Sequence, residues 1–185
     1  MKYKLAVLAV VLFLTGCVSE NSQMERAMNL RSKLLAQPCT FTAEIAADYG
    51  DKVFQFAVDC KMDTQGALEF AVTAPESISG IAGNISNKGG KLTFDEEALS
   101  FPLLAQGEVT PISAPWVLMH TLRSGYLTSC GMEGGVIRLA IDDSYADNAL
   151  HLDIWLDEAD LPARGEILWQ GRRILSITIK DFVFV

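Results

Sequence analysis

The sequence predicts an α+β domain that consists mainly of antiparallel strands. Stretches in which apolar and polar residues alternate recur after residue 38, and this is the period of a half-buried strand. Turn sequences such as DYGDK, NKGG and WQGR separate these stretches. One apolar stretch, WVLMHTL, has helical spacing and interrupts the strands. We therefore expect a strongly curved, incomplete β-barrel wrapped round one buried helix, with another helix on its N-terminal side.

The first helix is predicted over residues 24–37. Ala27, Leu30 and Leu34 fall on one apolar stripe of this stretch, and charged residues occupy the rest of its surface. Pro38 follows directly and cannot continue a helix. The strand pattern begins at the next residue.

The second helix is predicted after Ser113, a residue type that can cap a helix. Pro115 suits its first turn, and Gly125 suits its end. Strands are predicted at residues 39–49, 53–62, 67–74, 78–86, 91–95, 137–141, 150–156, 165–169 and 173–184, with a further edge strand in EALSFPLL.

The N-terminal end of the chain is typical of a secretory signal. Lys2 and Lys4 precede the apolar stretch LAVLAVVLFL, which is shorter than the about 20 residues that a membrane-spanning helix needs. The next four residues, LTGC, end at Cys17 and resemble the lipobox of bacterial lipoproteins. The resemblance implies that residues 1–16 are removed and that Cys17 carries a diacylglycerol and acyl chains such as palmitate. The alternative is an ordinary signal peptide with a chance cysteine.

Residues 17–23 are then expected to be the lipidated cysteine and a polar tether, with a reach of roughly 20 Å at most. Residues 24–185 are long enough for a single β-rich domain with its own core. Two or three acyl chains hold a protein on a membrane far more firmly than one. We therefore expect an extracytoplasmic protein anchored to the cell membrane.

The charge of the chain restricts its partners. The formal net charge is −8, and removal of Lys2 and Lys4 with the signal takes it to −10. An acidic domain is repelled by an anionic leaflet, so attachment to the membrane rests on the acyl chains. No basic stripe is present, which argues against binding of nucleic acid.

Three cysteines remain in the predicted domain, at positions 39, 60 and 130. Cys39 and Cys60 each alternate in phase with apolar residues of two neighbouring predicted strands. A hairpin centred on Tyr49 and Gly50, or on Gly50 and Asp51, places both on one face, and only directly opposite positions suit a disulfide. We predict a Cys39–Cys60 disulfide, and the alternative is three free buried thiols.

The sequence offers little for catalysis or metal binding. His120 and His151 are isolated and lack the spacing of a zinc site. No GxSxG stretch is present, and the acidic stretches IDDSYADN and WLDEAD do not match a calcium-binding loop. We therefore expect a protein that is not an enzyme and has no metal and no cofactor.

The order of features is a lipobox, a helix, a series of strands, one apolar helix and further strands. This order resembles the LolA/LolB lipoprotein-carrier superfamily, which includes lipid-binding lipoproteins of Gram-positive bacteria. The stretches FAVTAPESISGIAG, ISAPWVLMHTLRSGY and RRILSITI look like those of small lipoproteins of Firmicutes. The resemblance implies an incomplete barrel that encloses an apolar cavity for acyl chains, and hence a carrier or sensor of a lipid.

Within this resemblance, the central apolar helix is the candidate ligand site. Trp116, Leu118, Met119 and Leu122 are expected to form the floor of a cavity, where methionine adapts to variable chains. The alternative is that these residues are ordinary core. In that case the protein is a non-catalytic scaffold or interaction module of the cell envelope, with a fully packed core and a protein partner.

Overall fold

The computed structural model describes residues 18–185, apart from residues 49, 51, 95–96, 102–103 and 106–107. The predicted signal of residues 1–16 and the predicted lipidation site Cys17 lie outside the described residues. The described residues form two α-helices, α2 (Val18–Ala36) and α3 (Ala114–Ser124), and two short 3-10 turns, η1 (Glu76–Ile78) and η2 (Pro111–Ser113). None of the described helices is both long enough and apolar enough to cross a membrane.

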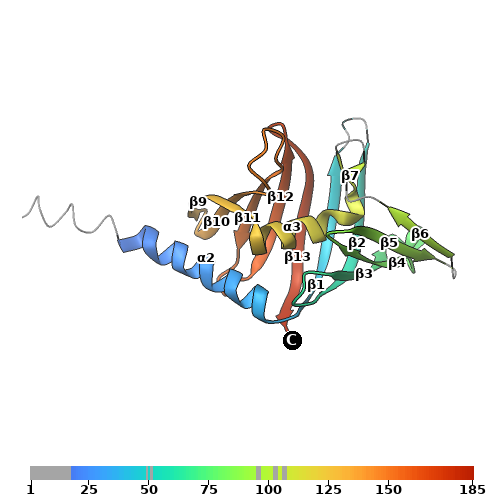
Figure 1. Ribbon diagram of the computed structural model, residues 1–185, viewed down its shortest axis with the longest axis horizontal. Coiled ribbons are helices and arrows are strands. Elements are labelled where there is room, and N and C mark those ends of the chain that lie inside the picture. Colours follow the sequence, from blue (N-terminus) through green and yellow to red (C-terminus); the bar gives the residue numbers. More distant parts are fainter. Residues whose placement is uncertain (1–17, 49, 51, 95–96, 102–103, 106–107) are drawn as a thin grey trace, which may run out of the picture.

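Eleven antiparallel strands form one open, curved sheet (Figure 1). Their order across the sheet is β6-β5-β4-β3-β2-β1-β13-β12-β11-β10-β9, so β6 and β9 are its edges. The strands of this sheet are β1 (Cys39–Asp48), β2 (Val53–Met62), β3 (Leu68–Ala74), β4 (Ala82–Ser86), β5 (Gly89–Phe94), β6 (Glu97–Phe101), β9 (Tyr126–Glu133), β10 (Val136–Asp142), β11 (His151–Leu156), β12 (Pro162–Trp169) and β13 (Arg172–Phe184). The predicted class, mainly antiparallel strands with two helices, is confirmed.

A two-stranded hairpin of β7 (Leu104–Ala105) and β8 (Glu108–Val109) stands apart from the large sheet.

The structure differs from the strand predictions at residues 78–81 and at β9. Residues 78–81 do not belong to a strand, because the chain first forms η1 and enters β4 only at Ala82. Strand β9 was not predicted, because its side chains are exposed or half-buried throughout, and an edge strand of this kind shows no alternation.

Helix α2 begins earlier than the sequence predicts. Residues 18–23 were expected to be a polar tether, but they form the first turns of the helix. Six helical residues advance the chain by about 9 Å, against roughly 20 Å for the same residues when extended. Within the described residues, the helix therefore starts at Val18.

The predicted apolar stripe of α2 is confirmed. Ala27, Leu30 and Leu34 are each no more than 2% exposed, and they face the body of the domain. The helix lies against β9 and against α3 (Figure 1). Its outward side carries polar residues, as expected for a helix that covers one end of a sheet.

Two arginines fix α2 on opposite flanks. Nε of Arg26 donates to both carboxylate oxygens of Asp160, at 2.8 and 3.0 Å, in the turn between β11 and β12. The guanidinium of Arg31 donates to the carbonyl oxygen of Gly125, directly after α3. Together with the buried stripe, these contacts set both the position and the rotation of the helix.

Helix α3 lies across the concave face of the sheet and contacts β10, β11, β12 and β13 (Figure 1). Its approach to β12 is especially close. Gly165 of β12 lies beneath Leu118, and a Cβ atom at Gly165 would lie 1.9 Å from Cδ1 of Leu118. The absence of a side chain at this position therefore lets the helix rest directly on the sheet.

The ends of α3 follow the sequence in part. Pro115 lies in the first turn, as predicted. The hydroxyl of Ser113 donates to the carbonyl of Thr110 at 2.7 Å and does not cap the helix, because Ser113 is itself part of η2. Gly125 follows the helix in an extended conformation, and a Cβ atom there would come within 2.7 Å of Ile141.

Substitution of Gly165 by alanine tests the close contact between α3 and the sheet. We expect Gly165→Ala to lower the free energy of unfolding by about 1–3 kcal/mol, because the added methyl group must displace Leu118. The matched control is Gly131→Ala in β9, where a Cβ atom would have no neighbour within 4 Å. The control is expected to change stability by less than about 0.5 kcal/mol. Urea unfolding measures both, and equal effects would contradict the contact.

Candidate functional site

Helix α3 is bound to the turn that joins β2 and β3. Nε1 of Trp116 donates to the carbonyl oxygen of Gly66 at 2.8 Å, in a buried setting. The guanidinium of Arg123, itself only 8% exposed, donates to the carbonyl oxygens of Asp63 at 3.3 Å and Thr64 at 2.7 Å. Three backbone acceptors of one turn are therefore satisfied by one helix, and we call this set of contacts the α3 latch.

The four predicted ligand-binding residues lie at the contact between α3 and the sheet. Trp116 is 5% exposed, and Leu118, Met119 and Leu122 are fully buried. None of them lines the grooves that cross β1, β2 and β3. In this structure their role is packing.

The inner face of β2 becomes progressively uncovered toward the start of the strand. Val58, Cys60 and Met62 are buried, whereas Phe56 is half-buried and Phe54 is 52% exposed. All five side chains share one face, because they are two residues apart along the strand. The sheet therefore presents aromatic surface at the end that α3 does not reach.

A third aromatic residue lies at the same end of the sheet. Phe54 pairs with Ala47 of β1, and Ala47 pairs with Leu175 of β13. Leu175 pairs in turn with Ile167 of β12, two residues before Trp169. Trp169 is half-buried and packs against the core.

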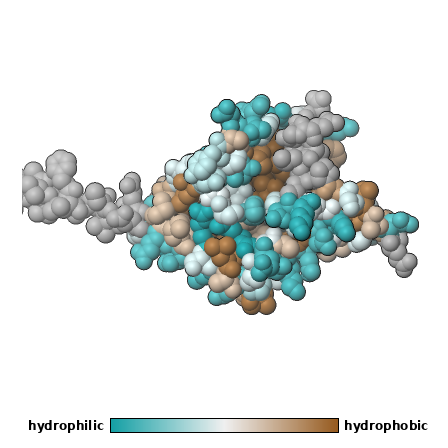
Figure 2. Space-filling view, in the orientation of Figure 1, coloured by the Kyte–Doolittle hydropathy of each residue, from teal (hydrophilic) through white to brown (hydrophobic). Residues whose placement is uncertain are grey.

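We call Phe54, Phe56 and Trp169 the apolar rim. Ala47, which pairs directly with Phe54, is fully buried, so the exposed aromatic surface at this end comes from the rings themselves. Figure 2 shows apolar surface gathered in a recess above α3, next to the grey atoms. The sequence contains a signal for this rim, since Phe54 and Phe56 continue the alternation of β2, but that signal does not distinguish covered from uncovered positions.

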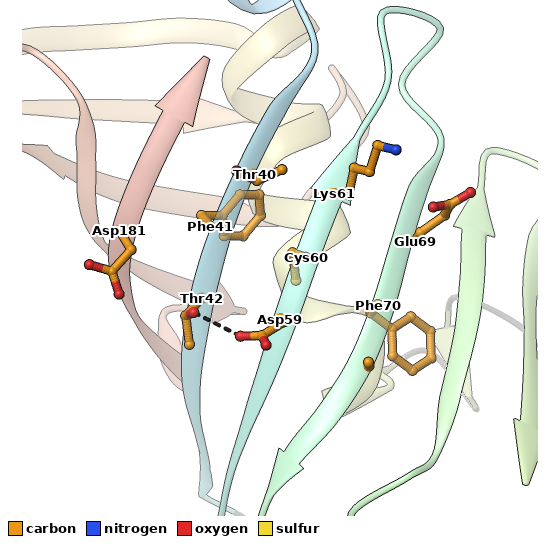
Figure 3. Close-up of a pocket in the computed structure, with 10 residues that line it drawn as sticks. Thr40, Phe41, Thr42, Asp59, Cys60, Lys61, Glu69, Phe70 and Asp181 are labelled. Carbon is orange, nitrogen blue, oxygen red and sulfur yellow. Dashed lines mark hydrogen bonds between the residues drawn. The ribbon is translucent and has the colours of Figure 1, made fainter. Parts of the chain in front are cut away.

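The opposite face of the central strands carries open grooves of a different character. A groove of about 510 Å³ crosses β1, β2 and β3 and is lined by polar side chains such as Thr42, Asp59, Lys61 and Glu69 (Figure 3). The hydroxyl of Thr42 donates to Asp59 at 2.8 Å across its floor. A second groove, of about 480 Å³, lies on the same face of these strands. Both grooves have mixed linings, and the second includes Phe56, Ala57 and Pro75.

The predicted Cys39–Cys60 disulfide is wrong in this structure, where both thiols are free and buried. The two residues share a face, but Cys39 pairs with Met62 and Cys60 pairs with Phe41. This is the register centred on Gly50 and Asp51, which sets the cysteines diagonally and not directly opposite.

Burial also makes the two thiols unreactive. It raises the pKa of the Cys39 thiol to about 11. Burial raises the pKa of Cys60 still further, with the nearby carboxylate of Asp59 acting in the same direction. Cys130 is half-buried, and burial raises its pKa as well.

The two histidines lie in different elements, His120 in α3 and His151 in β11. The ring of His120 stacks on Trp116 with centroids 4.5 Å apart, and burial together with Arg123 lowers the pKa of His120. Nδ1 of His151 lies 2.7 Å from a carboxylate oxygen of Asp142, on the neighbouring strand. Within the described part of the chain, no group of three or more histidine, cysteine or acidic side chains is placed to hold a metal ion.

Comparison with solved structures identifies the fold. A "putative outer membrane lipoprotein-sorting protein domain" from Vibrio parahaemolyticus is 11% identical in sequence, with a TM-score of 0.50, and the match covers 89% of this chain and 93% of that one. The chain shares the fold of this domain. An uncharacterized conserved protein from Thermus thermophilus matches at 12% identity and a TM-score of 0.50, over 88% of this chain and 87% of that one.

A LolA superfamily protein from Nitrosomonas europaea aligns at 10% identity and a TM-score of 0.44, over 84% of this chain and 92% of that one. The similarity to the Vibrio parahaemolyticus and Thermus thermophilus structures is a similarity of fold. No protein-family model matches the sequence, and no curated protein matches it significantly.

Thiol labelling of the folded segment 19–185 tests the cysteine assignments. We expect a maleimide at pH 8 to modify Cys130 first, because the thiolate is the reactive form and Cys39 and Cys60 are buried with raised pKa values. Mass spectrometry before and after unfolding without reductant measures the reaction, and Cys130→Ser is the control. All three thiols should react after unfolding. A single modified thiol under denaturing conditions would instead reveal a Cys39–Cys60 bond.

Proposed function

We propose that this protein is a membrane-anchored extracytoplasmic lipoprotein that carries or senses a lipid or another hydrophobic ligand on the concave face of its sheet. The apolar rim is the observation that carries the proposal. It presents Phe54, Phe56 and Trp169 at the end of the concave face that α3 leaves uncovered. The chain also shares the fold of the Vibrio parahaemolyticus domain, whose description is lipoprotein-sorting.

The ligand would bind by burial of its acyl chain. Each methylene group removed from water contributes about 0.8 kcal/mol, so even part of a fatty acyl chain is held firmly. The chain would first cover the rings of Phe54 and Phe56. It would then extend along the inner face toward Trp116, Leu118, Met119 and Leu122, which form the wall provided by α3.

The anchor in this proposal is Cys17, acylated after removal of residues 1–16. The acyl chains would keep the apolar rim close to the membrane in which a lipid ligand resides. The acidic charge of the domain supports attachment by lipid and not by surface charge. Catalysis forms no part of the proposal, because the two histidines lie in separate surroundings.

A second candidate function is a non-catalytic scaffold of the cell envelope that binds a protein partner. The observation that favours it is the complete burial of Leu118, Met119 and Leu122, which leaves the helix–sheet contact without space for a chain. In this case the concave face would serve stability alone. The two candidates differ in whether the apolar rim binds lipid.

Native mass spectrometry of the segment 19–185, purified from a bacterial host under mild conditions, distinguishes them. We expect bound masses that extraction identifies as lipid. Phe54→Asp should weaken binding of a fluorescent fatty acid about tenfold or more, since losing the contact of one aromatic side chain costs about 1.5–3 kcal/mol. Phe54 is half exposed, so the substitution leaves the core intact.

Leu99→Asp is the matched control, because Leu99 is 63% exposed and lies on the edge strand β6, away from the rim. This variant should bind as the unmodified protein does. If the protein shows only its own mass, without bound lipid, even after incubation with phospholipid and fatty acid, this result would refute the carrier function and favour the scaffold.

A further inference from the structure

The position of α2 relative to the predicted anchor has a geometric consequence. The helix begins at Val18, one residue after Cys17, so no flexible segment separates an acylated cysteine from the helix. In Figure 1 this end of α2 projects past β9 at the side of the molecule where the chain enters. Acyl chains on Cys17 would therefore hold the first turn of α2 at the membrane directly.

Helix α2 is in turn rigidly connected to the domain. Arg26 bonds to Asp160 on one flank, and Arg31 bonds to the carbonyl of Gly125 on the other. Between these flanks, the buried stripe of Ala27, Leu30 and Leu34 packs against the domain. The orientation of the helix on the membrane is therefore also the orientation of the whole domain.

The flank of α2 that faces β9 carries exposed apolar side chains. Met24 and Met28 are 40% and 50% exposed, and they lie on the same side of the helix as Arg31, which is two turns after Met24. Arg31 reaches the start of β9, so this flank is the one next to that strand. Met132 of β9 is 51% exposed as well.

We infer that the methionine flank of α2, made of Met24 and Met28, rests on the phospholipid surface when Cys17 is acylated, with Met132 of the adjacent strand β9 as a third exposed methionine at that surface. The inference rests on the anchor in the proposed function. An upright helix would place Met24 about 10 Å from the anchor, beyond a headgroup layer of roughly 5–8 Å. A helix that lies along the membrane brings the methionines into that layer, where apolar side chains on one flank bind the interface. Methionine side chains adapt readily to the irregular packing of lipids.

Depth-dependent quenching tests the orientation. The full-length acylated protein is reconstituted in vesicles of phosphatidylcholine and phosphatidylglycerol that contain nitroxide-labelled lipid. A bimane label is placed at Met24→Cys, Met28→Cys or Met132→Cys, in a Cys130→Ser background that leaves only buried thiols in the domain. The control is Leu99→Cys, an exposed position on the opposite edge strand.

We expect the labels at positions 24, 28 and 132 to lose most of their fluorescence and the label at position 99 to keep it. Unquenched labels at 24 and 28 on acylated, vesicle-bound protein would overturn the inference and leave the anchor intact. Equal quenching at all positions, or cross-linking of two copies through position 28, would also overturn it. Protein without an acyl mass would overturn the anchor and this inference together, whereas failure to bind a lipid ligand would leave the orientation unaffected.

Discussion

An open sheet of eleven strands has an apolar inner face that must be covered, and the contact of α3 with that face is the constraint on which the structure depends. Gly165 lets Leu118 approach the backbone of β12, and this closeness determines how tightly the sheet curves round the helix. The end of α3 then supplies the carbonyl of Gly125, to which α2 bonds through Arg31. Helix α2 thus takes its position from helix α3.

The same contact divides the inner face of the sheet into a covered and an uncovered part. Where α3 lies on the sheet, its apolar side chains are fully buried and no space is left. Beyond the reach of α3, β2 continues with two phenylalanines on its inner face, and their exposure rises toward the start of the strand. The inner face is therefore packed under the helix and partly exposed past its end.

Alternation and turn residues were sufficient to predict the strands that have one buried face, and the helical stripe of Ala27, Leu30 and Leu34 predicted α2. Strand β9 was not predicted, because an edge strand without a buried face has no period to detect. The disulfide prediction failed because a shift of one residue at the turn moves a cysteine from an opposite to a diagonal position. Whether Trp116, Leu118, Met119 and Leu122 bind a ligand stays a prediction; the structure buries all four, and periodicity shows which side a residue faces and not what lies above it.

The α3 latch has a consequence for rates. Displacing α3 from the turn between β2 and β3 breaks its hydrogen bonds to the carbonyls of Asp63, Thr64 and Gly66, of which, among the described residues, only Asp63 keeps another donor, the amide of Gly66. Release of the helix from this turn therefore costs all three bonds. In the proposed function, an acyl chain that enters beneath α3 would have to wait for release and would associate more slowly than diffusion allows, whereas a chain that stays at the apolar rim would not. Fast exchange at the rim and slow exchange beneath the helix would then be properties of one face of the sheet.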